Sequence, residues 1–202
     1  MFQRSLQPLP APVADGAFFL CAKSDGPVPV ASALGRMALI QAALDPDIAS
    51  ISPPPLLFDG AHGGLTAVLT GVDGLRAAIL IDGDGDAFAD KTPDDIRSAA
   101  AGHGLAFRLL GRADVEAEPF HSNARQVWCC RRRFVPAGDL VRVLHFLSEN
   151  GASPLIEAAQ AATGSRDGVE TVLALACRDR VEISLRERLL GPETPVRIRQ
   201  RD

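Results

Sequence analysis

The sequence predicts a mixed α/β protein that ends in a small helical domain. Two β-rich runs, an amphipathic segment and a third β-rich run follow one another between residues 65 and 110, which is the order of a mixed sheet with a covering helix. After residue 136, three helical patterns precede two short strand-like runs. The 202 residues, 47% of them hydrophobic, are enough to bury a sizeable core. We therefore predict one domain in residues 1–130, with 1–15 as a peripheral tail, and a second domain in residues 131–202.

The early part of the first domain is predicted as strand, helix, strand and hairpin. Residues 13–22 form a strand, and a helix follows from an N-cap at Ser32 to Pro46, with apolar residues at helical spacing. Residues 48–60 are β-rich but contain three prolines, which restricts them to an edge strand or an irregular segment. The Val-Asp-Gly turn at residues 72–74 then predicts a hairpin.

A second helix is predicted to begin at Thr92. Thr92 is a suitable N-cap, Pro93 suits the first helical position, and Asp94 and Asp95 lie over the positive end of the helix dipole. This helix ends at a glycine pair, and residues 105–110 form the next strand. The first domain is therefore expected to contain a mixed sheet.

The second domain is predicted to contain three helices and a hairpin. The helices lie in residues 139–151, 153–164 and 168–180, with Ser153 and Pro154 at the start of the second, and the strands lie in residues 181–185 and 195–199. This order is that of a winged helix, in which the second and third helices form a helix-turn-helix and the hairpin forms the wing. A small apolar three-helix unit without a role in DNA binding is the alternative.

Arginine is concentrated in the second half of the chain, whereas most acidic residues lie before residue 124. Because arginine favours bidentate contact with phosphate and guanine, we expect a nucleic-acid-binding face there. A solvated charged surface is the alternative. Trp128 precedes the basic run and is either a base-stacking residue or a buried anchor. The candidate DNA-binding residues are Arg131, Arg132, Arg133, Arg178, Arg180, Arg197 and Arg199.

Residues 81–95 contain aspartates at alternate positions between a strand and a helix. Asp82, Asp84 and Asp86 match the first ligands of a calcium loop, but Ala87 replaces the turn glycine and Pro93 replaces the bidentate glutamate. The run is therefore a solvated acidic turn, a weak site for a divalent ion, for which Mg²⁺ or Mn²⁺ is expected, or a true calcium loop.

Short patterns in the chain are similar to those of one family. They include Phe107-Arg108, the step at residues 112–115 (Arg-Ala-Asp-Val), and Asn123-Ala124-Arg125 before the basic run. With the helix around residues 32–46 and the winged-helix-like end, the chain resembles the TnsA-like transposon endonucleases over about residues 30 to 200. The resemblance implies a restriction-endonuclease-like mixed-sheet core followed by a domain that binds DNA or a partner.

The same resemblance implies that catalysis has been lost. Cleavage by this fold needs a glutamate from the first helix, a hairpin aspartate, and an acid-x-lysine pair on the next strand to bind metal and activate water. The resemblance places these groups at Gly35, near Ala67, and at Asp82 and Asp84. Only Asp82 keeps a ligand, and Asp84 puts an anion where a cation belongs. Asp82, Asp84 and Asp73 are thus expected to be vestigial.

Three functions follow as hypotheses. The first is a catalytically degenerate TnsA-like subunit of a DNA-processing system, with a transposase or an ATPase regulator as partner by analogy. The second is a divergent, active metal-dependent endonuclease that uses Asp82, Asp84 and Asp73. The third is a protein-interaction module, which the net charge of −4 favours. We expect a cytoplasmic protein without a membrane partner, because no apolar run approaches membrane-spanning length and the four cysteines read as free thiols.

Overall fold

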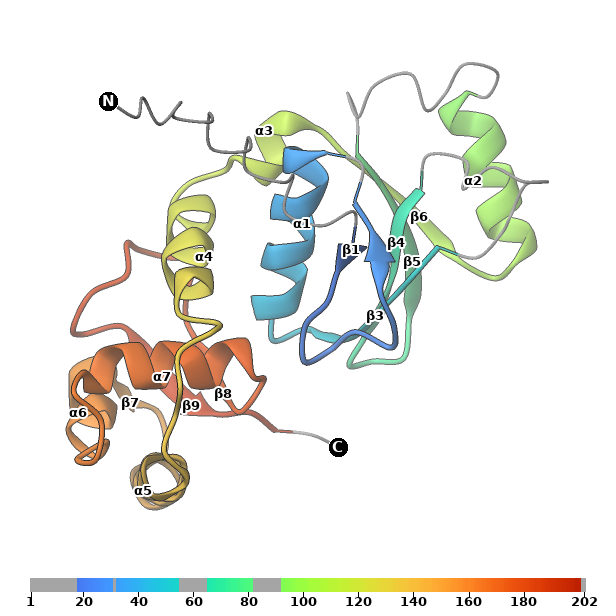
Figure 1. Ribbon diagram of the computed structural model, residues 1–202. Coiled ribbons are helices and arrows are strands. Elements are labelled where there is room, and N and C mark those ends of the chain that lie inside the picture. The colour runs from blue at the N-terminus through green and yellow to red at the C-terminus, as the bar shows by residue number, and fades with distance from the viewer. Residues whose placement is uncertain (1–17, 31, 55–64, 82–91, 201–202) are drawn as a thin grey trace, which may run out of the picture.

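The computed structural model describes residues 18–30, 32–54, 65–81 and 92–200, and Figure 1 shows how their elements are arranged. The elements of the first half are β1 (Phe18–Phe19), β2 (Val28–Pro29), α1 (Ala33–Leu44), β3 (Ile48–Ser52), β4 (Leu65–Gly71), β5 (Arg76–Ile81), α2 (Pro93–Gly102) and β6 (Ala106–Leu110). Those of the second half are α3 (Arg112–Val115), α4 (Phe120–Cys129), α5 (Ala137–Asn150), β7 (Ser153–Pro154), α6 (Leu155–Gln160), α7 (Gly168–Cys177), β8 (Val181–Ile183) and β9 (Pro195–Ile198).

A four-stranded mixed sheet forms the centre of the first half. Its order is β3-β4-β5-β6, in which β3, β4 and β5 are antiparallel and β6 runs parallel to β5 after the crossover through α2. The hairpin predicted at residues 72–74 joins β4 to β5: Gly74 has φ of 77°, and the carboxylate of Asp73 accepts a hydrogen bond from the Leu75 N–H at 2.9 Å. The mixed α/β fold and the edge position of β3 are therefore confirmed.

Helix α1 is buried on nearly all sides. Its N-cap is Ser32, as predicted, and the Ser32 hydroxyl accepts a hydrogen bond from the Gly35 N–H at 2.8 Å. Nine of its 12 residues are buried, because one side covers the sheet and the other contacts α4 and α7. A helix that is apolar all round is expected to be enclosed in this way.

Helix α2 covers the opposite face of the sheet (Figure 1). It begins with a capping box in which Thr92 and Asp95 bond each other's backbone N–H groups. Its buried residues Ile96 and Ala100 pack against Val68 and Leu80, whereas the alternate residues of the same strands pack toward α1. Because side chains alternate along a strand, one set of residues thus faces α1 and the other set faces α2.

Helix α4 was not predicted. Its buried residues Phe120, Asn123, Ala124 and Val127 have helical spacing, but half of the helix is polar and the apolar pattern is short. The Asn123 amide donates hydrogen bonds to the carbonyls of Leu185 and Arg188, each at 2.8 Å, and its oxygen accepts one from the Leu190 N–H at 2.8 Å. This one side chain therefore ties α4 to the connection between β8 and β9.

The second half contains the three predicted helices and a three-stranded sheet of order β7-β9-β8. The start of the second helix was predicted wrongly: Ser153 and Pro154 form β7, which pairs with β9, so α6 begins at Leu155. The loop before α7 is held by Asp139, whose carboxylate accepts hydrogen bonds from the Gly164 N–H at 2.8 Å and from Ser165. Asp139 also pairs with Arg142 of the same helix.

One hydrophobic core crosses the predicted domain boundary at residues 130 and 131. It runs without a break from Ile79 and Leu39, through Val127 of α4, to Leu175 and Val196. Helix α4 contacts both α1 and α7 and so links the two halves. None of the helices in the described part of the chain is long and apolar enough to cross a membrane.

Candidate functional site

A basic groove lies where the ends of α4 and α7 meet the segment around β1. Its volume is about 480 Å³. Arg131 and Arg132 follow α4, Arg178 follows α7, and Arg36 projects from α1. None of the described residues that line the groove is acidic. Of the seven predicted DNA-binding arginines, the structure therefore brings Arg131, Arg132 and Arg178 together on one surface, which we call the basic groove.

Arg36 was missed by the sequence analysis. It is the only charged residue in the sequence of α1, ALGRMALIQAAL. A single cation in an otherwise apolar and buried helix needs a place where its charge reaches solvent. The single arginine in the sequence of α1 could therefore have indicated a functional position. Which residues surround Arg36, however, depends on how α4 and α7 pack against α1.

Two arginines of the basic groove are positioned by backbone carbonyls in the last turn of α4 and in the loop that follows it. Arg131 donates a hydrogen bond to the Trp128 carbonyl at 3.2 Å, and its guanidinium lies over the Trp128 ring at 5.6 Å from the centroid. Arg178 donates to the Arg133 carbonyl at 2.7 Å. Cations at helix C-termini are stabilised by the helix dipole, so these side chains also have a structural role.

The Trp128 ring is engaged within the protein. It stacks on Phe19 with ring centroids 5.3 Å apart and an angle of 17° between the planes. With Arg131 also over the ring, Trp128 has the contacts of a packing anchor, which favours that alternative over base stacking. The large apolar residues that are exposed among the described lining of the groove are Phe18 and Leu20, at 57% and 67%.

The remaining predicted arginines lie elsewhere. Arg133 pairs with Glu170 at 2.8 Å and lines a different pocket. Arg197 is exposed and pairs with Glu182, and Arg180 is exposed as well. These three do not join the basic groove.

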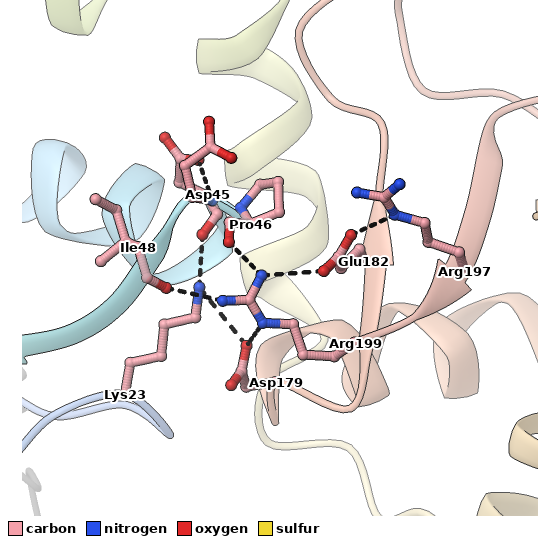
Figure 2. Close-up of polar contacts among 9 residues, drawn as sticks. Lys23, Asp45, Pro46, Ile48, Asp179, Glu182, Arg197 and Arg199 are labelled. Carbon is pink, nitrogen blue, oxygen red and sulfur yellow. Dashed lines mark hydrogen bonds and ion pairs between the residues drawn. The ribbon is translucent and has the colours of Figure 1, made fainter. Parts of the chain in front are cut away.

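Arg199 is a correction to the predicted DNA-binding set, because its side chain is only 6% exposed. Figure 2 shows it inside a junction cluster formed by Lys23, Asp45, Asp179, Glu182 and Arg199. The guanidinium of Arg199 pairs with Asp179 at 3.3 Å and with Glu182 at 3.0 Å, and it donates to the carbonyls of Pro46 and Ile48. Arg199 therefore fastens β9 to the segment between α1 and β3 and is not available to DNA.

Lys23 completes the junction cluster. Its ammonium donates to the Asp45 carbonyl at 2.6 Å and lies 3.6 Å from Asp179. Burial lowers the pKa of Lys23 below its usual value, and the attraction of Asp179 opposes this shift. The cluster thus matches each buried cation with an anion or a carbonyl, as a structural junction requires.

Most of helix α7 is buried within the protein. In the predicted helix-turn-helix this helix would enter the major groove. The residues from Thr171 to Cys177 are all buried, because α7 packs against α6, α4 and α1. Only its first turn, residues 168–170, is partly exposed.

Only Asp73 of the acidic residues proposed as a vestigial active site lies among the described residues. Asp82, Asp84 and Asp86 lie outside them. Asp73 lies in the turn before β5, and the described part of that strand ends at Ile81. Six residues of extended chain separate the two ends, which is roughly 20 Å at the rise of a β-strand.

The sheet register identifies the position that faces Ala67. Ala67 pairs with Ile79, and Ile81 lies two residues further along the same face of β5. All three side chains are at most 1% exposed and belong to the core under α1. The described residues beside Ala67 are therefore Ile79 and Ile81, and Gly35 of α1 is buried too. The predicted pair Asp82 and Asp84 lies outside the described residues.

The described residues contain no group of three His, Cys, Asp or Glu side chains able to hold a metal ion. What the geometry provides instead is a cationic groove with an apolar rim on a mixed α/β scaffold. Such a surface can bind an anionic ligand by charge and hydrogen bonding. A scan against protein-family models and a search of curated proteins each find no match to this chain.

Proposed function

We propose that the protein is a catalytically degenerate, TnsA-like subunit of a DNA-processing system that binds DNA through the basic groove. The element order α1, β3, β4, β5, α2, β6 supports the restriction-endonuclease-like core that the resemblance implies. The order α5, β7, α6, α7, β8, β9 supports the winged-helix-like end, with β8 and β9 as the wing.

Loss of catalysis is supported by the chemistry around Ala67. Metal-assisted cleavage requires carboxylates that converge on an ion at the scissile phosphate. Gly35, Ala67, Ile79 and Ile81 have no side-chain atom that could bind a metal ion, and all four residues are buried.

The observation that carries the proposal is the basic groove itself, where four arginines meet and none of the described lining residues is acidic. Arginine binds phosphate oxygens in bidentate fashion and remains charged at all physiological pH values. Because α7 is covered, the expected contacts are with the DNA backbone, and binding should depend little on sequence.

The test is the salt dependence of duplex DNA binding, measured by fluorescence anisotropy. The variant Arg131→Gln/Arg132→Gln/Arg178→Gln removes three cations of the groove, and the matched control Arg125→Gln/Arg166→Gln/Arg188→Gln removes three exposed cations elsewhere. If each groove arginine contacts one phosphate, the slope of log K against log salt changes by about 2.7 in the groove variant, since each contact contributes about 0.9. Equal slopes for the two variants would refute the groove as the DNA site.

Nuclease activity remains the competing hypothesis for the acidic run. Nicking of supercoiled plasmid in Mn²⁺ by the wild-type protein, lost in Asp82→Ala/Asp84→Ala, would establish a divergent active site and contradict the proposed loss of catalysis. Absence of nicking at protein excess, together with salt-dependent binding, is the result expected here.

A partner protein is the second candidate ligand, because Phe18 and Leu20 expose apolar surface beside the arginines. Aromatic residues and arginine are enriched at protein interfaces. By family analogy the partner would be a transposase or an ATPase regulator. The variant Phe18→Ser/Leu20→Ser would then lose partner binding but keep the salt-dependent binding of DNA.

A further inference from the structure

Among the described strands, β6 is an open edge of the main sheet. Its partner is β5, and no other described segment pairs with it (Figure 1). A strand at an edge carries a row of backbone N–H and C=O groups that point away from the sheet. Residues 106–110 therefore present a template on which another extended segment can add.

A groove of about 710 Å³, lined by apolar side chains together with several polar and charged ones, lies beside this edge. Its floor contains Leu69 and Ile79 of the sheet, because α1 does not extend over β6. One wall comes from Ala38 and Ala42 of α1, and the other from Val115 and Phe120. We call this surface the β6 groove.

The side chains of β6 alternate between the two faces of the sheet. Phe107 packs in the cluster under α2, whereas Leu110 packs against the core that contains α1. Arg108, two residues from Leu110, therefore points to the α1 face and lines the β6 groove.

Arg108 is the cation of the β6 groove that lacks an ion pair within the described chain. It is exposed, and no acidic side chain among the described residues pairs with it. By contrast, Arg186 pairs with Asp45 at 2.6 Å, and Asp114 accepts the Gly111 N–H at 2.8 Å. One uncompensated positive charge thus lies at the middle of the open strand.

A second copy of the chain does not fit this edge. If the five residues of β6 paired antiparallel with β6 of a second copy, Arg108 would lie at the centre of the pairing. The two Arg108 guanidinium groups would then lie opposite each other. Like charges directly opposite in neighbouring strands are destabilising. The charge of Arg108 calls for an acidic residue in that position.

We propose that β6 is a docking site for an extended segment of a partner protein, which pairs with the strand and places an acidic side chain opposite Arg108. Residues two positions to either side of that acid lie on the same face and would fill the β6 groove with apolar side chains. The partner segment therefore has the pattern apolar, any, acidic, any, apolar. This site is separate from the basic groove and does not depend on DNA binding.

The test uses two capped peptides, Ser-Val-Thr-Glu-Thr-Val-Ser and Ser-Val-Thr-Lys-Thr-Val-Ser, titrated into the full-length protein labelled with ¹⁵N. We expect the glutamate peptide to shift the amide signals of residues 106–110 and to bind the wild-type protein about two- to five-fold more tightly than the lysine peptide. In Arg108→Glu the preference should reverse. A glutamate peptide N-methylated at alternate backbone nitrogens cannot form the ladder and should not bind.

Three results would overturn the proposal. The first is equal binding of the N-methylated peptide, because pairing with the backbone would then not be involved. The second is the absence of shifts in residues 106–110 at saturating peptide. The third is a concentration-dependent shift of these residues without peptide, which would identify a second copy as the occupant. Arg108→Glu should leave the salt slope of DNA binding unchanged, so failure here is distinguishable from failure of the basic groove.

Discussion

The buried amide of Asn123 offers a sharp test of how the two halves of the protein are joined. The amide makes three hydrogen bonds to the connection between β8 and β9, and Asn123 is only 1% exposed. Asn123→Ala removes all three bonds. At about 1 kcal/mol for each bond, the free energy of unfolding should fall by about 3 kcal/mol. The melting temperature should fall by roughly 6–12 °C, since about 1 kcal/mol corresponds to 2–4 °C in a chain of this size.

Asn123→Asp separates hydrogen bonding from packing. The carboxylate has nearly the shape of the amide, but it places an acceptor where the amide donates to the Leu185 and Arg188 carbonyls. At neutral pH we expect this variant to lose more stability than Asn123→Ala, and to recover part of it on acidification because a protonated carboxyl can donate one bond. The surface variant Gln126→Ala on the same helix is the control and should stay within about 0.5 kcal/mol of wild type.

Urea denaturation followed by circular dichroism measures these differences, and hydrogen exchange of the Leu190 amide reports the local bond. The reasoning is refuted if Asn123→Ala is as stable as Gln126→Ala. It is also refuted if Asn123→Asp is more stable than Asn123→Ala at neutral pH, because the two donated bonds would then not exist.

Three further predictions concern buried polar groups and thiols. Arg199→Ala removes the buried cation that Asp179 and Glu182 share and leaves the Pro46 and Ile48 carbonyls without this donor, so it should cost about 3–5 kcal/mol in denaturation experiments. The exposed Arg197→Ala should cost at most about 1 kcal/mol, and equal losses would contradict the junction cluster. Hydrogen bonds, of which the largest contribution comes from the Ser165 hydroxyl, hold the pKa of Asp139 below its usual 3.8. The ionised Asp139 therefore stabilises the folded protein above pH 3.8, and this contribution is lost as the pH falls through the lower pKa of the folded state. Urea midpoints of Asp139→Asn should therefore depend less on pH in this acidic range than those of wild type, and parallel curves would argue against this assignment. Burial raises the pKa of Cys177 to about 12. A thiol reagent at mildly alkaline pH should therefore modify the exposed Cys129 first and Cys177 only when the protein unfolds. Early labelling of Cys177 in the Cys129→Ser variant would show that Cys177 is not buried.

Local chemistry in the sequence was enough to predict most elements. The caps at Ser32 and Thr92 and the hairpin at residues 72–74 depend on side chains within three residues of the backbone groups that they bond. Helix α4 was missed because its buried face includes the polar Asn123, whose partners lie more than 60 residues away in the chain. A hydrophobic pattern cannot reveal a helix side that is buried partly through hydrogen bonds.

The candidate sites depended more strongly on tertiary structure. Arginine content predicted a cationic surface, and Arg131, Arg132 and Arg178 do share one groove. The same composition could not separate these residues from Arg199, because burial is decided by the docking of β9 against the end of α1. Likewise, the strand register that sets Ile79 beside Ala67 follows from pairing across the sheet and not from spacing along the chain.

The sequence by itself determined where the chain turns and caps its helices, and which segments carry charge, because these depend on neighbouring residues. Only the tertiary structure decided which charges face solvent, which edge of the sheet stays open, and how α4 joins the two halves into one core. The physical reason is that burial and pairing are properties of contacts between distant segments, whose energies appear only when the segments meet.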